Sequence, residues 1–156
     1  MKVLLLGIGN PGRRDDGLGP ALAEAAERWH VPGLTVDSDY QLTVEDSAAA
    51  AEHDVLIVAD AAAAGPEPFS FRVLQPSEHL EFSSHSVEPS GVLGLARHMF
   101  GRAPAAYVLA VRGYDFDHVL DPGLSDAARA NLAAALAFLE PLVRSGEFAR
   151  AASSEG

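Results

Sequence analysis

Short runs of continuous aliphatic residues recur along the chain and predict buried strands. The strongest runs cover residues 2–8, 54–59 and 105–111. Runs of this length without polar interruption are typical of strands buried on both faces of a parallel sheet. Residues 34–40 are less apolar but favour another strand, and residues 69–74 predict an edge strand or one arm of a hairpin. The pattern therefore predicts a sheet of about five strands.

Between these strands, apolar residues recur at the spacing of amphipathic helices. The first helix is expected to begin close to Asp16 or Gly17, because Pro20 is tolerated only in a first helical turn. The start and stop signals of the later helices are Thr43 with Asp46 three residues on, Pro89, Gly101 and Ser125.

Strands that alternate with helices predict an α/β fold. We expect a three-layer sandwich, in which a twisted and mainly parallel sheet lies between two layers of helices. The chain of 156 residues is long enough for one domain with its own core. We expect this domain to span residues 1–147 and residues 148–156 to form a flexible tail.

The composition excludes several kinds of chemistry and several partners. The sequence has no cysteine, which excludes disulfides, thiolate metal sites and cysteine nucleophiles. A net charge of −11 would repel phosphate backbones and anionic lipid, so we expect neither nucleic acid nor membrane as a partner. The N-terminal run becomes glycine-rich where a signal peptide would be cleaved, and no apolar stretch is long enough to span a bilayer. We therefore expect a cytoplasmic protein.

The first strand ends in a glycine turn that precedes two adjacent acids. Gly7, Gly9 and Gly12 have the spacing of a dinucleotide-binding fingerprint after a strand. A pyrophosphate would rest on the N-terminus of the following helix, where Asp15 and Asp16 would repel it. One acid is enough to cap a helix, so the second one indicates another purpose. A nucleotide-binding module stays an alternative to a site built on these acids.

Asp60 follows the second strongly apolar strand, and small alanines flank it. In open α/β sheets, ligands bind outside the carboxyl ends of the strands. If Asp16 and Asp60 end neighbouring strands, their carboxylates approach each other, which would raise the pKa of one of them. A divalent metal would resolve this repulsion. His85, in an irregular serine-rich stretch before a helix, is the candidate imidazole ligand.

The other histidines have simpler explanations. His98 is expected near a helix C-terminus, where the helix dipole favours it, and His30, His53 and His79 look solvated. His118 lies in the acidic segment DFDHVLD, residues 115–121, which could bind a cation but lacks the spacing and glycine of an EF-hand loop. We keep that segment as a minor cation-site hypothesis.

Three segments together resemble the hydrogenase maturation endopeptidases, which trim the C-terminus of the [NiFe]-hydrogenase large subunit. The matching segments are GIGNPGRRDDGLG (7–19), VLIVADA (55–61) and SSHSVEPSGVLGLAR (83–97). The resemblance implies a twisted sheet with helices on both faces, of the phosphorylase/hydrolase-like type. It also implies a metal site formed by Asp16, Asp60 and His85, next to an active-site loop that contains Gly9 and Asn10.

The resemblance further implies a substrate and a cofactor. The partner would be the large-subunit precursor, nickel already inserted in that precursor would be recognised, and a single cut would release a C-terminal peptide. Zinc or cadmium could replace nickel at such a site, and the protein is expected to be a monomer. Relatives often have glutamate where Asp16 stands, Asp15 is the alternative register, and Asp39 is a secondary acidic candidate.

Two further alternatives remain. The opening GIGNPG is also similar to peptidyl-tRNA hydrolases, but RRDDGLGP follows it here and the charge of −11 does not suit a tRNA partner. A metal-dependent assembly factor without peptidase activity would bind the same precursor and leave its length unchanged.

Overall fold

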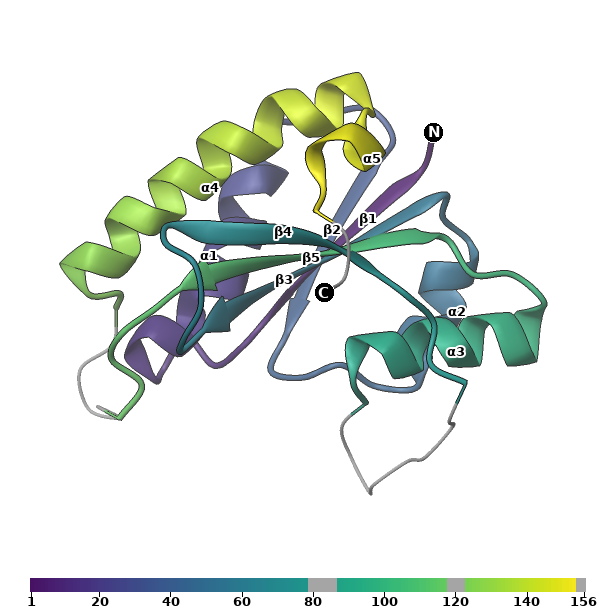
Figure 1. Cartoon of the computed structure of the whole chain (residues 1–156), viewed down its shortest axis with the longest axis horizontal. Coiled ribbons are helices and arrows are strands. Elements are labelled where there is room, and N and C mark those ends of the chain that lie inside the picture. The colour runs from purple at the N-terminus through teal and green to yellow at the C-terminus, as the bar shows by residue number, and fades with distance from the viewer. Residues whose placement is uncertain (79–86, 118–122, 154–156) are drawn as a thin grey trace.

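The computed structural model describes residues 1–78, 87–117 and 123–153 (Figure 1). In this part of the chain the strands are β1 (Val3–Ile8), β2 (Leu34–Asp39), β3 (Val55–Ala62), β4 (Phe69–Leu74) and β5 (Ala105–Arg112). The helices are the 3-10 helix η1 (Arg14–Gly17), α1 (Leu18–Glu27), α2 (Glu45–Ala51), α3 (Pro89–Phe100), α4 (Asp126–Ser145) and α5 (Phe148–Ala151).

The strands form one sheet in the order β2-β1-β3-β5-β4. The first four strands in this order are parallel, and β4 pairs antiparallel with β5 at the edge. The predicted number of strands, their mainly parallel arrangement and the edge position of residues 69–74 are therefore confirmed. Because parallel strands end at the same side of a sheet, the carboxyl ends of β1, β2, β3 and β5 share one edge.

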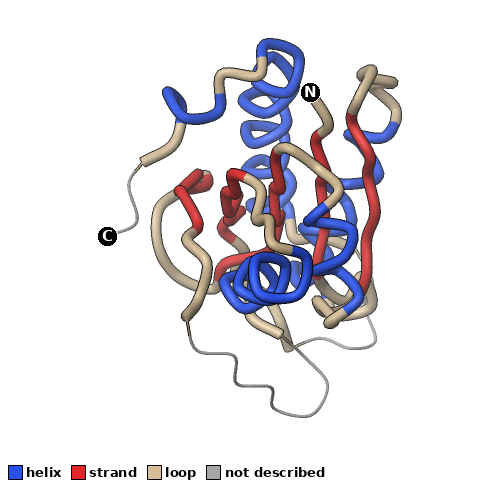
Figure 2. The backbone as a smooth tube through the Cα atoms, turned by 90° about the vertical axis from the view of Figure 1, so that its right-hand side faces the viewer, coloured by secondary structure: helices blue, strands red, loops and turns tan. Residues whose placement is uncertain are grey.

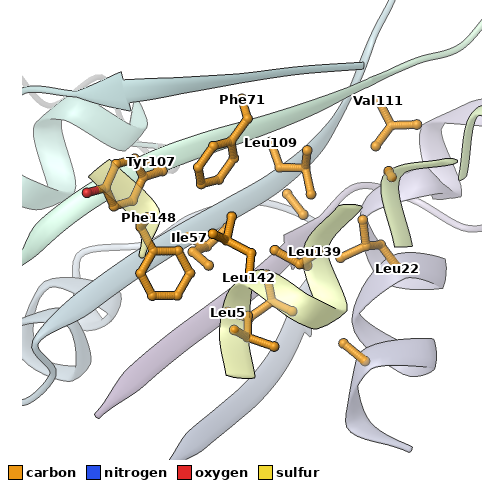
Figure 3. Close-up of a cluster of buried hydrophobic side chains, with 14 of the residues drawn as sticks. Leu5, Leu22, Ile57, Phe71, Tyr107, Leu109, Val111, Leu139, Leu142 and Phe148 are labelled. Carbon is orange, nitrogen blue, oxygen red and sulfur yellow. The ribbon is translucent and has the colours of Figure 1, made fainter. Parts of the chain in front are cut away.

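Helices cover both faces of the sheet, which confirms the predicted three-layer sandwich. Helices α1 and α4 pack on one face together with α5, and α2 and α3 pack against each other on the opposite face (Figures 1 and 2). Leu5, Ile57 and Leu109 from three strands point into the first of these layers, where they contact Leu139 and Leu142 of α4 (Figure 3). Burying each of these side chains stabilises the fold by about 1.5–3 kcal/mol.

Local signals place most helix ends where the sequence predicts them. Pro89 is the first residue of α3, and Gly101 ends that helix in the left-handed conformation. Ser125 caps α4 by accepting a hydrogen bond from the Ala128 N–H at 3.2 Å. Helix α2 begins at Glu45, after Thr43, whose N–H donates to the Asp46 carboxylate at 2.8 Å.

Strand β3 is longer than the sequence pattern predicts. The apolar run ends at Ala59, but β3 continues through Ala62, because Asp60, Ala61 and Ala62 stay paired with β5. Asp60 therefore lies within the strand near its carboxyl end. A strand that keeps a hydrogen-bonded neighbour holds a side chain more firmly than a loop does.

The C-terminal segment packs against the sheet, where the sequence predicts a flexible tail from residue 148. Phe148 is only 2% exposed and its ring lies 5.8 Å from that of Tyr107. The Ser153 N–H donates to the Phe71 carbonyl at 3.0 Å, and the Val73 N–H donates to the Ser153 carbonyl at 3.0 Å. The buried ring of Phe148 and the outer backbone groups of β4 thus hold residues 148–153. The composition of this short segment does not indicate either contact.

Candidate functional site

Asp16 and Asp60 belong to segments at the carboxyl ends of two neighbouring strands, β1 and β3. Strands β1 and β3 are paired, with Gly7 opposite Ala59. Asp16 lies in η1 just after β1, and Asp60 is the next residue of β3 after Ala59. Strand β2 lies on one side of β1 in the sheet, and the next strand along the chain, β3, lies on the other side of β1. This reversal of strand order is a topological switch point, where α/β sheets commonly bind ligands.

The turn after β1 holds Asp16 in place. The Asn10 N–H donates to Asp16 Oδ2 at 2.8 Å, and the Gly12 N–H donates to Asn10 Oδ1 at 2.9 Å. Gly9 has φ of 142°, and a Cβ there would overlap the carbonyl oxygen of Asp16. Glycine is therefore required at position 9, both for its backbone conformation and for the close approach of η1.

Asp60 is an acid whose surroundings disfavour its charged form. Burial, followed by the negative charges of Asp16 and Glu88, raises the pKa of Asp60 to about 6, although the Ala61 N–H donates to its Oδ1 at 2.8 Å. The charge of Asp16 thus contributes to the raised pKa of Asp60, as expected for neighbouring aspartates, although burial is the larger cause. A cation bound between these carboxylates would offset both the repulsion and the burial cost.

Glu88 is a third carboxylate near this site that the sequence analysis does not single out. It is the N-cap residue of α3, and its charge contributes to the raised pKa of Asp60. The neighbouring Val87 N–H donates to the Leu42 carbonyl at 3.3 Å, which ties the start of α3 to the segment after β2. The available signal was an acid directly before a helix-starting proline, three residues after His85.

Asp15 points into the protein, unlike its neighbour Asp16. It is 0% exposed, and its carboxylate accepts hydrogen bonds from the N–H groups of Tyr114 (2.8 Å), Asp115 (3.0 Å) and Ser125 (2.7 Å) and from the Ser125 hydroxyl (2.8 Å). Burial alone would raise the pKa of Asp15, but these hydrogen bonds outweigh it and lower the pKa below its usual value.

Asp39 ends β2 on the other side of the glycine turn. Its carbonyl accepts a hydrogen bond from the Gly9 N–H at 3.1 Å, and its Oδ1 accepts one from the Tyr40 N–H at 2.7 Å. The Asp39 residue is exposed. The structure thus places this secondary candidate at the rim of the glycine turn and gives its side chain a local turn contact.

His85 belongs to residues 79–86, which lie outside the described part of the chain, as do His79, His118 and Asp121. The imidazole proposed from sequence and most of the minor cation site therefore have no described position. Within residues 1–78, 87–117 and 123–153, no group of three or more histidines and acids is arranged to hold a metal.

Two of the remaining histidines, His53 and His98, lie near the ends of helices. His98 lies in the last turn of α3, as predicted. His53 is 7% exposed, so the prediction that it is solvated is wrong. Its Nδ1 lies 2.6 Å from the Ala49 carbonyl oxygen, and this contact at the end of α2 explains the buried ring.

Among the described residues, none of the helices combines the length and the hydrophobicity that a membrane span requires.

No known family profile matches the chain, and no curated protein matches it in sequence. Several solved structures match it over nearly their whole length. The hydrogenase maturating endopeptidase HybD from E. coli has 23% identity and a TM-score of 0.68, with 94% of each chain covered. The [NiFe] hydrogenase maturation protease HycI from Thermococcus kodakarensis KOD1 has 16% identity and a TM-score of 0.70, with 92% of each chain covered.

An endopeptidase from Escherichia coli gives 24% identity and a TM-score of 0.70, with 95% of each chain covered. The similarity therefore extends over nearly the whole of each chain. The chain has the fold of the hydrogenase maturation proteases.

Proposed function

We propose that this protein is a hydrogenase maturation endopeptidase that removes a C-terminal extension from the precursor of a [NiFe]-hydrogenase large subunit. The observation that carries this proposal is the position of Asp16 and Asp60. Asp16 lies in η1 after β1, and Asp60 lies near the carboxyl end of the neighbouring strand β3, at the switch point of the sheet. The fold of this sheet and its helices is shared with such proteases over nearly the whole chain. The motif resemblance of residues 7–19, 55–61 and 83–97 supports the same function.

In this proposal Asp16, Asp60 and His85 contact the nickel that the precursor already contains. Two carboxylates and one imidazole suit a borderline divalent metal such as nickel, and would also accept zinc or cadmium. The metal would help to orient the precursor and polarise a carbonyl group. The chain's own contribution is to hold Asp16 through Asn10 and Asp60 through its paired strand. We infer a cytoplasmic, monomeric enzyme.

The glycine turn argues against a nucleotide-binding module. A Cβ at Gly7 would overlap the Gly19 carbonyl oxygen, and a Cβ at Gly9 would overlap that of Asp16. These glycines are therefore explained by the close packing of η1 and α1 on β1. No phosphate is needed to account for them, and the acids of η1 would repel one.

The direct test is to incubate the purified protein with the nickel-loaded precursor and measure the mass of the precursor. We expect the loss of one C-terminal peptide, and no loss from precursor prepared without nickel. Intact nickel-loaded precursor would contradict the proposal. If the protein binds the precursor but leaves its length unchanged, it is a non-proteolytic assembly factor instead.

A further inference from the structure

Three consecutive residues of the RRDD run contact the segment that follows β5. Arg13 Nη2 donates to the Phe116 carbonyl at 3.2 Å, and Arg14 Nε lies 3.5 Å from the Asp115 carboxylate. The Asp15 N–H donates to the Asp115 carbonyl at 2.9 Å. Residues 13–15 thus run alongside residues 114–116, and η1 has a fixed partner about a hundred residues further along the sequence.

The Asp15 carboxylate is the centre of this contact. Its four hydrogen-bond donors come from the two ends of the connection between β5 and α4. Tyr114 and Asp115 lie near the start of this connection, and Ser125 lies at its end as the cap of α4. Gly113 packs so close that a Cβ there would lie 2.9 Å from Asp15 Cβ. Hydrogen bonds to an ionised acceptor are about twice as strong as neutral ones.

The position of Asp15 dictates the direction of Asp16. Both lie in the 3-10 helix η1, and a helix with about three residues per turn separates adjacent side chains by roughly 120°. With Asp15 fixed inward, Asp16 must point out of the protein interior, where its Oδ2 accepts the Asn10 N–H. The carbonyl group of Asp16 also packs closely against Gly9, with no room for a Cβ between them. A rotation of η1 towards Gly9 would therefore cause a backbone clash.

We propose that Asp15 is a positioning residue, which orients the metal-contacting Asp16 by locking η1 to the connection between β5 and α4. This inference rests on the proposed function in that it assigns Asp16 to the site. It gives Asp15, the first acid of the DD pair, a role other than helix capping or metal binding, because both of its carboxylate oxygens accept hydrogen bonds inside the protein.

Asp15→Asn is the sharpest substitution, because it keeps the shape of the side chain. One carboxylate oxygen accepts two backbone N–H groups and the other accepts a third. In either orientation of the amide, its NH2 group faces at least one of these N–H donors. The substitution therefore breaks the lock without creating a cavity.

The experiment measures amide hydrogen exchange by NMR, without metal or substrate. The Asn10 N–H reports on the direction of Asp16, and the Ile57 N–H in the central strand reports on global stability. In Asp15→Asn we expect protection at Asn10 to fall at least about 10-fold more than at Ile57. The matched control is Val143→Ala. Val143 is a buried residue that lines a cavity with Val3, at the edge of the sheet opposite to the site. This variant should lower the exchange protection of the Asn10 and Ile57 N–H groups by equal factors.

If Asn10 protection in Asp15→Asn falls only in step with Ile57, Asp15 has a merely structural role and the inference is overturned. Should Asp15→Asn fail to fold, Ser125→Ala removes one donor to Asp15 together with the side-chain cap of α4. In that variant the protection of the Asn10 N–H must still fall more than that of the Ile57 N–H, by a smaller factor. In the precursor assay we expect kcat of Asp15→Asn to fall by up to about 100-fold, with KM changed much less. A wild-type protein that leaves the precursor intact would refute the proposed function, whereas the exchange result would still decide the role of Asp15.

Discussion

The negative charge of Asp16 lies close enough to Asp60 to raise the pKa of the Asp60 carboxyl group. Burial is the larger cause of this shift, and Glu88 adds to it. A folded protein that holds an acid in this state loses stability when the acid ionises, unless a cation compensates. The site is therefore arranged for a ligand that brings positive charge.

The first prediction concerns stability and pH. The folded pKa of Asp60 is about 6 and the unfolded value is 3.8, so the folded state binds more protons between these values. The contribution of Asp60 is fully present below about pH 4 and is lost as the pH rises through about 6. The difference of about 2.2 between these pKa values corresponds to a loss of about 3 kcal/mol, at about 1.36 kcal/mol for each pKa unit, and we expect Asp60→Asn to remove it.

Chemical denaturation of the metal-free protein between pH 4 and pH 8 would measure this effect. Relative to wild type, Asp60→Asn should become progressively more stable across that interval, while its Oδ1 can still accept the Ala61 N–H. The surface variant Glu24→Gln serves as a control and should follow the wild-type curve. Parallel curves for Asp60→Asn and wild type would contradict the raised pKa.

The second prediction concerns cleavage of the precursor. Asp16→Asn, Asp60→Asn and His85→Ala should each abolish processing, because each removes a proposed contact to the nickel of the substrate. Circular dichroism should show that all three stay folded. His98→Ala changes a histidine at the far end of α3 and should remain active. An inactive His98→Ala together with an active His85→Ala would show that the imidazole is wrongly assigned.

The third prediction concerns the glycine turn. Gly9→Ala should both strain the backbone and push η1 away from β1, because φ is 142° and a Cβ would overlap the Asp16 carbonyl oxygen. Gly65→Ala is a matched control, since φ is 102° and no atom lies within 4 Å of the added Cβ. We expect Gly65→Ala to cost about 1–3 kcal/mol from backbone strain and Gly9→Ala clearly more.

Thermal denaturation and precursor cleavage would separate the two glycine variants. Only Gly9→Ala should lose processing, because only there does the added methyl group displace the backbone that carries Asp16. Equal losses of stability in both variants would mean that the overlap of a Cβ at position 9 with the Asp16 carbonyl oxygen does not contribute to the destabilisation.

The fourth prediction concerns the C-terminal segment. Truncation after Glu147 removes the buried ring of Phe148 and the backbone pairing of Ser153 with β4. Loss of a buried aromatic side chain typically costs about 3–5 kcal/mol, so the midpoint of urea denaturation should fall substantially. Truncation after Ser153 keeps these contacts and should be nearly neutral. A protein unaffected by the longer truncation would restore the idea of a flexible tail.

The sequence predicts the sheet because its strands are local features. Each of the central strands is a continuous aliphatic run, and Pro89, Gly101 and Ser125 mark helix ends by their own backbone and side-chain chemistry. The approach of Asp16 and Asp60 could also be predicted, since it follows from the parallel order of β1 and β3.

The division of roles between Asp15 and Asp16 could not be predicted in the same way. Two adjacent aspartates look alike in a sequence, and the donors that draw Asp15 inward lie 99 to 110 residues away. The proximity of Glu88 to Asp60 has the same origin, because it depends on how α3 packs. The docking of Phe148 likewise depends on a partner, Tyr107, that no local pattern reveals.

The pairing of Ser153 with β4 has a consequence for how copies of the protein meet in solution. Ser153 occupies the Phe71 carbonyl and the Val73 N–H on the outer side of β4, which hinders the addition of a strand from another molecule there. At the opposite side, β2 carries the exposed acids Asp37 and Asp39, and two such borders would repel each other. Both edges of the sheet therefore carry a feature that disfavours edge-to-edge pairing between copies of the protein.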